Sequence, residues 1–162
     1  MKEAIQTLIT SDKMTHAFEY LKQDEAHTID QQIELVQISS FSPFEEKRAI
    51  RFKELLTEAG LDPVMDEVHN VYAHIHGTGN GPTLYVSAHL DTVFPPETPL
   101  PVKREGTKIY APGIGDDTRG LAEILTLARA IKESGLKPVG DIIIGGNVGE
   151  EGLGDLRGMR HF

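Results

Sequence analysis

The sequence predicts an α/β protein in which helices cover a mixed or mostly parallel β-sheet. Amphipathic helical patterns alternate along the chain with short apolar segments rich in β-branched residues. Acidic and imidazole clusters follow three strand-like or turn segments, and sites in α/β folds gather at the carboxyl ends of strands. The chain has 162 residues, of which 39% are hydrophobic and 25% charged, which suits one globular domain with a buried core.

The N-terminal part of the chain is predicted to be helical. Residues 1–40 are expected to form one or two amphipathic helices. Their apolar side includes Ile33, Leu35, Val36 and Ile38. A further helix is expected to have Ser42 as its N-cap, Pro43 at its first position and Glu45 as the partner of a capping box, and to end at Gly60. Its apolar positions recur at helical spacing, at Ala49, Phe52, Leu55, Leu56 and Ala59.

Strand-like segments follow this helix. Residues 63–69 and 71–76 are both predicted to be extended, and the glycine-rich stretch 77–82 is predicted to be a turn or loop. Residues 83–88 indicate a buried strand that ends in His89.

The remaining chain predicts one long helix between two strands. A proline-rich loop over 94–101 precedes the strand-like residues 108–110. A strongly amphipathic helix follows and is closed by Gly135. Its apolar positions are Leu121, Ile124, Leu125, Ala128 and Ile131. Residues 141–145 predict a central strand that leads to Glu150.

The charge of the chain excludes one large class of partners. The formal net charge is −9, so the phosphates of a nucleic acid would be repelled. The absence of cysteine excludes disulfides and thiolate chemistry. The N-terminus has no apolar signal core and no apolar run reaches the length of a bilayer span, so we expect a cytoplasmic protein without a membrane partner.

The first cluster is His89-Leu90-Asp91. In an extended backbone, residues i and i+2 share one face, so both polar side chains are predicted to point the same way. His89 can then bind a metal ion through one ring nitrogen while the Asp91 carboxylate accepts a hydrogen bond from the other. A histidine at a strand end that merely pairs with a nearby carboxylate is the alternative interpretation.

The second cluster, Asp116-Asp117, opens the predicted long helix. One alternative is a helix N-terminus whose acidic residues interact favourably with the helix dipole. Another is a dinucleotide-binding loop that begins at Gly113 and Gly115. Two aspartates would repel its phosphate, and the third glycine is misplaced for the Gly-x-Gly-x-x-Gly pattern. A carboxylate that bridges two cations suits this position better.

The third cluster, Glu150-Glu151, lies between Gly149 and Gly152 after the predicted central strand. A solvated pair of glutamates is the alternative, but this context is poor for an exposed helix face. Neighbouring side chains at a strand end point to different sides, so one glutamate is expected to bind metal and the other to act as a general base. One imidazole with several carboxylates suits zinc or a similar divalent ion.

In chain order, three stretches resemble the M20 family of metallopeptidases and deacylases, with its peptidase T-like and carboxypeptidase G2-like members. They are SAHLDTVF (87–94), APGIGDDTRGLAEIL (111–125) and GNVGEEGLGDLRG (146–158). The resemblance implies that His89 binds one metal ion, Asp116 bridges two and Glu151 binds the other. It also implies that Asp91 orients His89, that Glu150 is the general base, and that the Asp116–Asp117 peptide bond is cis.

The resemblance further implies a phosphorylase/hydrolase-like catalytic domain with two Zn²⁺ ions, Co²⁺ or Mn²⁺ being alternatives. The activity implied is hydrolysis of a peptide or N-acyl amino acid amide bond. Thr118 departs from the family pattern, since many relatives have lysine there. Two other readings stay open. One is a non-catalytic fragment or degenerate homologue that binds a metal or a partner. The other is an M28-type aminopeptidase, which also uses His-x-Asp, Asp and Glu-Glu.

Members of the M20 family continue well beyond the Glu-Glu motif. They add a lid or dimerisation domain, a further acidic ligand and a late histidine ligand. We therefore expect residues 1–162 to be the N-terminal portion of one catalytic domain, inactive by itself, from a protein that can form a homodimer. His161 follows Glu151 too soon to be that late ligand, and His74 and His76 are expected on a solvated strand face.

Overall fold

The computed structural model describes residues 2–162, and its main sheet is mixed. The strand order is β1-β2-β6-β3, with β1 at Val64–Met65, β2 at Val71–Ile75, β3 at Leu84–His89 and β6 at Ile142–Asn147. β3 and β6 run parallel, whereas the β1–β2 and β2–β6 pairs are antiparallel. The predicted α/β class with a mixed sheet is confirmed, and β6 is central as predicted.

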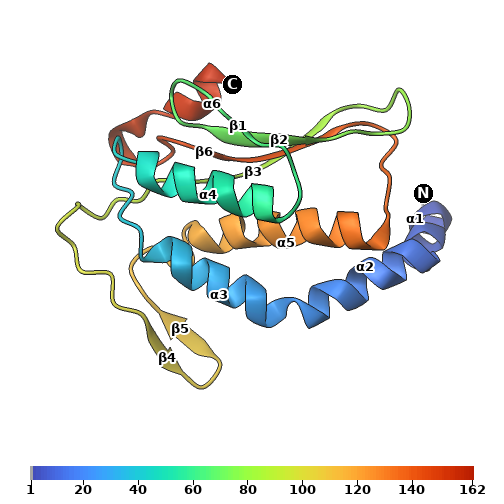
Figure 1. Cartoon of the computed structure of the whole chain (residues 1–162), viewed down its shortest axis with the longest axis horizontal. Coiled ribbons are helices and arrows are strands. Elements are labelled where there is room, and N and C mark those ends of the chain that lie inside the picture. Colours follow the sequence, from blue (N-terminus) through green and yellow to red (C-terminus); the bar gives the residue numbers. More distant parts are fainter. Residues whose placement is uncertain (1) are drawn as a thin grey trace.

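Helices form two layers beneath this sheet (Figure 1). The inner layer is α4 (Glu46–Glu58) and α5 (Thr118–Ser134), which contact the strands directly. The outer layer is α2 (Asp12–Gln23) and α3 (Glu25–Val36), which pack against α5. A first helix, α1, precedes them at Lys2–Ile9, so the first 40 residues hold three helices where we expected one or two.

The helix expected to begin at Pro43 begins at Glu46. The main-chain N–H of Phe44 donates to the carbonyl of Phe41, so residues 41–44 form a turn that delays the helix. Glu45 makes no side-chain cap, because its carboxylate is buried and bonded elsewhere. The predicted apolar face is confirmed, with Ala49, Phe52, Leu55, Leu56 and Ala59 all buried.

Two strand predictions need correction. The extended segment expected over 63–69 holds only the two residues of β1, because the Asp66 carboxylate accepts the N–H groups of Val68 and Asn70 and turns the chain. β3 is an edge strand of this sheet, and Leu84 at its start is 56% exposed. The strand is therefore buried only at its end, at Ala88 and His89.

The path of the chain brings three segments to one edge of the sheet. A small hairpin of β4 (Lys103–Glu105) and β5 (Lys108–Tyr110) interrupts the connection from β3 to α5. α5 then crosses beneath the sheet, ends before Gly135 in the left-handed region at φ 63°, and leads to β6. Because β3 and β6 are parallel, the ends of both strands and the start of α5 meet at the same edge.

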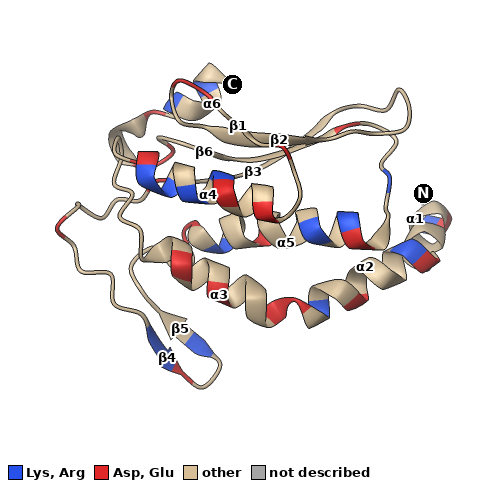
Figure 2. Cartoon of the chain, in the orientation of Figure 1, with Lys and Arg blue, Asp and Glu red and all other residues tan. Residues whose placement is uncertain are grey.

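Charged residues of both signs occur along the helices and on the β4–β5 hairpin (Figure 2). A short 3₁₀ turn at Gly152–Gly154 and a last helix, α6 (Arg157–His161), follow β6.

Within residues 2–162, every helix is too short or too polar to cross a membrane.

Candidate metal centre

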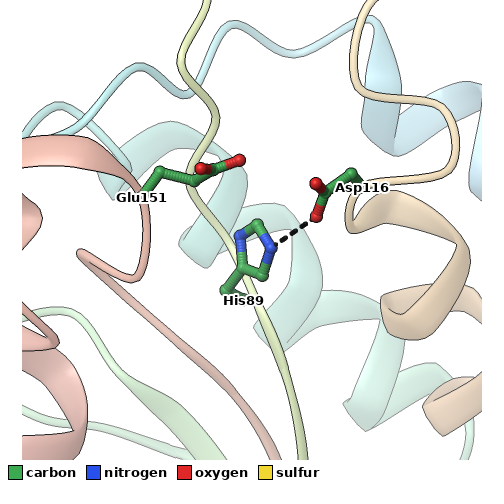
Figure 3. A group of neighbouring side chains, drawn as sticks. All are labelled: His89, Asp116 and Glu151. Carbon is green, nitrogen blue, oxygen red and sulfur yellow. Dashed lines mark hydrogen bonds and ion pairs between the residues drawn. The ribbon is translucent and has the colours of Figure 1, made fainter.

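Three predicted side chains meet at the carboxyl edge of the sheet (Figure 3). His89 is the last residue of β3, Asp116 lies just before α5, and Glu151 lies in the loop after β6. One ligand atom from each lies within 4.8 Å of the other two. The predicted convergence of the three clusters is therefore confirmed.

The imidazole of His89 faces Asp116 through Nε2, which lies 2.8 Å from the Asp116 Oδ1 atom. Its Nδ1 atom lies 3.0 Å from the main-chain carbonyl of Asp91 and 3.6 Å from the Asp91 Oδ1 atom. The acceptor nearest to Nδ1 is therefore the carbonyl and not the expected carboxylate. Since a carbonyl oxygen can only accept, Nδ1 carries a hydrogen in this arrangement and Nε2 is directed into the site.

The carboxylate of Asp91 holds the loop that carries the two glutamates. It is fully buried, and it accepts the N–H of Glu150 at 3.0 Å and the N–H of Glu151 at 2.8 Å. Asp91 thus connects the end of β3 to the loop after β6, so it orients the acidic pair as well as the imidazole.

The charges of the site perturb one another. Burial by itself would lower the pKa of His89, but the nearby carboxylates of Asp91, Asp116 and Asp117 raise that pKa to about 9. Burial, followed by the charges of Asp116 and the neighbouring carboxylates, raises the pKa of Glu151. A divalent cation among these groups would relieve this crowding of negative charge.

Glu150 lies at the solvent-exposed side of the group formed by His89, Asp116 and Glu151. Its Oε2 atom is 3.9 Å from Nε2 of His89, and its side chain is 46% exposed. The carboxylate is therefore beside the three converging ligand atoms and remains open to solvent.

The two neighbouring aspartates have separate roles, and the peptide bond between them is cis, as the resemblance implied. Asp116 is 80% exposed and faces His89. Asp117 caps α5 by accepting the N–H of Gly120, and it also accepts the main-chain N–H of His89. The alternative interpretation of an acidic helix start therefore describes Asp117 but not Asp116.

Local sequence patterns did not indicate the hydrogen-bonding groups that surround this site. Asn70 accepts the N–H of Val148, and Glu45 accepts the N–H of Gly149. Buried Arg48 donates to the carbonyl of Leu90, directly after His89, and to that of Ile38. Burial lowers the pKa of Arg48 to about 10, partly offset by the charge of Asp91. Only a charged residue within an otherwise apolar helix face could have indicated Arg48.

The other histidines lie elsewhere. His74 and His76 stack on each other beside the exposed side of β2. His161 is in α6, where its Nε2 atom is 3.2 Å from Glu67. Among residues 2–162, the side chains that meet at metal-ligand spacing are His89, Asp116 and Glu151.

Part of the chain is similar in sequence to a known peptidase family. Residues 85–162 match the sequence profile of peptidase family M20/M25/M40. Carboxypeptidase G2 of Pseudomonas sp. (strain RS-16) is 38% identical over 84 residues, which are 51% of this chain and 20% of that protein.

Solved structures agree with this match. A tripeptidase from Staphylococcus aureus superposes with a TM-score of 0.63 at 31% identity, over 78% of this chain and 37% of its own. The aminopeptidase PepT from Bacillus cereus has a TM-score of 0.64 at 26% identity, over 76% and 36%. The chain thus spans little more than a third of these relatives at most.

Proposed function

The chain belongs to peptidase family M20, and from this premise we propose that the whole protein hydrolyses the amide bond of a peptide or an N-acyl amino acid at a two-metal site. The observation that carries this proposal is the meeting of His89, Asp116 and Glu151 next to the half-exposed Glu150. The relatives named as a carboxypeptidase, an aminopeptidase and a tripeptidase support a peptide substrate.

The side chains present fit a pair of divalent ions. His89 would bind one ion and Glu151 the other, with the exposed Asp116 carboxylate shared between them. Imidazole nitrogen and carboxylate oxygen are donors that zinc takes in proteins, and Co²⁺ or Mn²⁺ accept the same donors. When bound, such ions polarise a carbonyl and lower the pKa of a water molecule.

Glu150 is the proposed general base. Its carboxylate takes a proton from the water that attacks the carbonyl carbon, and it passes that proton to the amine nitrogen as the carbon–nitrogen bond breaks. The partly exposed position beside His89 lets Glu150 reach both the water and the leaving group. Asp91 keeps the imidazole and the Glu150-Glu151 backbone in place during these steps.

The test uses the full-length protein and a panel of dipeptides, tripeptides and N-acyl amino acids. We expect hydrolysis with zinc or cobalt, loss of activity after chelation, and recovery when metal is returned. A preparation loaded with metal that hydrolyses none of the panel would favour the alternative, a protein that binds metal or a partner without catalysis. Glu105→Gln on the hairpin, where the side chain is 52% exposed, is a control that should leave activity unchanged.

A further inference from the structure

Glu45 is a buried carboxylate that lies outside the three converging ligands. Its Oε1 atom accepts the N–H of Gly149 at 3.2 Å and the guanidinium Nη2 of Arg157 at 2.7 Å. Its Oε2 atom is buried and has no hydrogen-bond partner among the described residues. Because a buried charge with an unpartnered oxygen is unfavourable, stability by itself is a poor reason for a carboxylate here.

The hydrogen bond between Gly149 and Glu45 is one of four that consecutive main-chain N–H groups donate along the loop after β6. The four successive N–H groups of residues 148–151 all donate to side chains of distant segments. Asn70 accepts the first, Glu45 accepts the second, and Asp91 accepts the third and fourth. Glu45 therefore holds the backbone immediately before the proposed base and the proposed metal ligand.

The backbone at this point has little room to move. Gly149 has φ 68°, and a Cβ atom there would lie 3.0 Å from the Cβ of Arg157 and 3.1 Å from the carbonyl oxygen of Gly154. The loop at Gly149 is therefore closely packed against Arg157, which forms the ion pair with Glu45. A change at Glu45 would act on Gly149 from two sides, through its N–H and through Arg157.

We propose that Glu45 is a positioning residue of the metal centre, which sets the direction of Glu150 and Glu151 through Gly149 and Arg157. The inference rests on the proposed function. Glu45 contacts Gly149 and Arg157 and lies outside the group of three proposed ligands, so we expect it to act through the loop. Residues that orient metal ligands typically change metal affinity or activity by about 10- to 100-fold when replaced.

The experiment compares variants of the full-length protein loaded with Co²⁺. Glu45→Met keeps the size of the side chain but removes the acceptor, and Arg157, at 33% exposure, can still reach water. Glu45→Gln keeps one oxygen for the N–H of Gly149. Glu46→Gln is the matched control, since the neighbouring carboxylate is 63% exposed. The readouts are Co²⁺ affinity, the visible spectrum of bound Co²⁺, and kcat and KM measured separately.

We expect Glu45→Met to weaken Co²⁺ binding by about 10- to 100-fold and to alter the Co²⁺ spectrum. Its kcat should fall while KM stays nearly constant, Glu45→Gln should retain more affinity than Glu45→Met, and Glu46→Gln should match the wild type. If Glu45→Met does not fold, Glu45→Asp gives the same test, since it keeps the charge but is one methylene too short to reach Gly149.

One outcome would overturn the inference and leave the proposed function standing. It is a folded Glu45→Met or Glu45→Asp variant whose Co²⁺ affinity and spectrum equal those of Glu46→Gln. The inference would also be overturned if Glu45→Gln binds Co²⁺ no more tightly than Glu45→Met, because the side-chain oxygen that accepts the N–H of Gly149 would then have no effect. A wild-type protein that binds no Co²⁺ would instead overturn the proposed metal centre, and the inference with it.

Discussion

The carboxylate of Asp91 accepts the main-chain N–H of Glu151 at 2.8 Å, although 60 residues separate the two in the sequence. The other oxygen of the same carboxylate accepts the N–H of Glu150. Asp91 also provides, through its main-chain carbonyl, the partner for the His89 ring. One residue therefore aligns the proposed nitrogen ligand, the proposed base and one proposed oxygen ligand.

Asp91→Asn should lower the free energy of unfolding by about 1–3 kcal/mol, because the new amide nitrogen cannot accept and leaves one loop N–H unsatisfied. Urea denaturation in the presence of a chelator measures this effect without any contribution from bound metal. Asp155→Asn is the control, since that carboxylate is 69% exposed and pairs with a surface arginine. Equal stability of the two variants would contradict the role given to Asp91.

Glu150→Gln and Glu151→Ala should separate proton transfer from metal binding in the full-length enzyme. The amide in Glu150→Gln cannot accept the proton, so turnover should fall by about 10²- to 10⁴-fold while metal content stays at the wild-type level. Glu151→Ala should lose about one bound ion per chain, as expected when a ligand is removed. Metal analysis beside steady-state kinetics checks both, and wild-type turnover in fully loaded Glu150→Gln would remove Glu150 from its role.

Zinc affinity should rise as the pH increases from 6 to about 9 and then level off. The pKa of His89 is about 9 in the metal-free site, so below this pH a proton must leave before Nε2 can bind an ion. Each pH unit below the pKa should therefore weaken apparent binding by about tenfold. Competition with a chromophoric chelator at several pH values measures this slope. Affinity that is constant between pH 7 and 9 would show that His89 does not release a proton on binding.

Arg48→Met should destabilise the protein more than Arg51→Met. Arg48 is fully buried and donates to the Ile38 and Leu90 carbonyls, so its loss leaves buried acceptors unpaired at a cost of about 2–4 kcal/mol. Arg51 contacts three glutamates, but all are on the surface, where such pairs contribute about 0–1 kcal/mol each. Thermal unfolding of both variants ranks them, and a larger loss for Arg51→Met would contradict this assignment.

Local patterns in the sequence predicted the class of fold and the edge of the sheet at which the site lies. Alternation of strands and helices predicted the sheet, the central β6 and the crossover helix α5. The position of each cluster after a strand or before a helix predicted that the three clusters would meet, and the resemblance to the M20 family selected His89, Asp116 and Glu151 within them. These signals are local because hydrophobic periodicity and helix ends depend on neighbouring residues.

Tertiary structure alone decided which side chains support that centre. The pattern Ser-Pro-Phe-Glu at 42–45 satisfies the rule for a capping box, yet Glu45 pairs with Gly149, which lies 104 residues away. The Asp91 carboxylate likewise accepts hydrogen bonds from main-chain N–H groups of the loop, while the main-chain carbonyl of Asp91 is the partner of the His89 ring. A buried hydrogen-bonding group takes whichever partner the packed chain brings within reach, and the distance along the sequence to that partner leaves no local pattern.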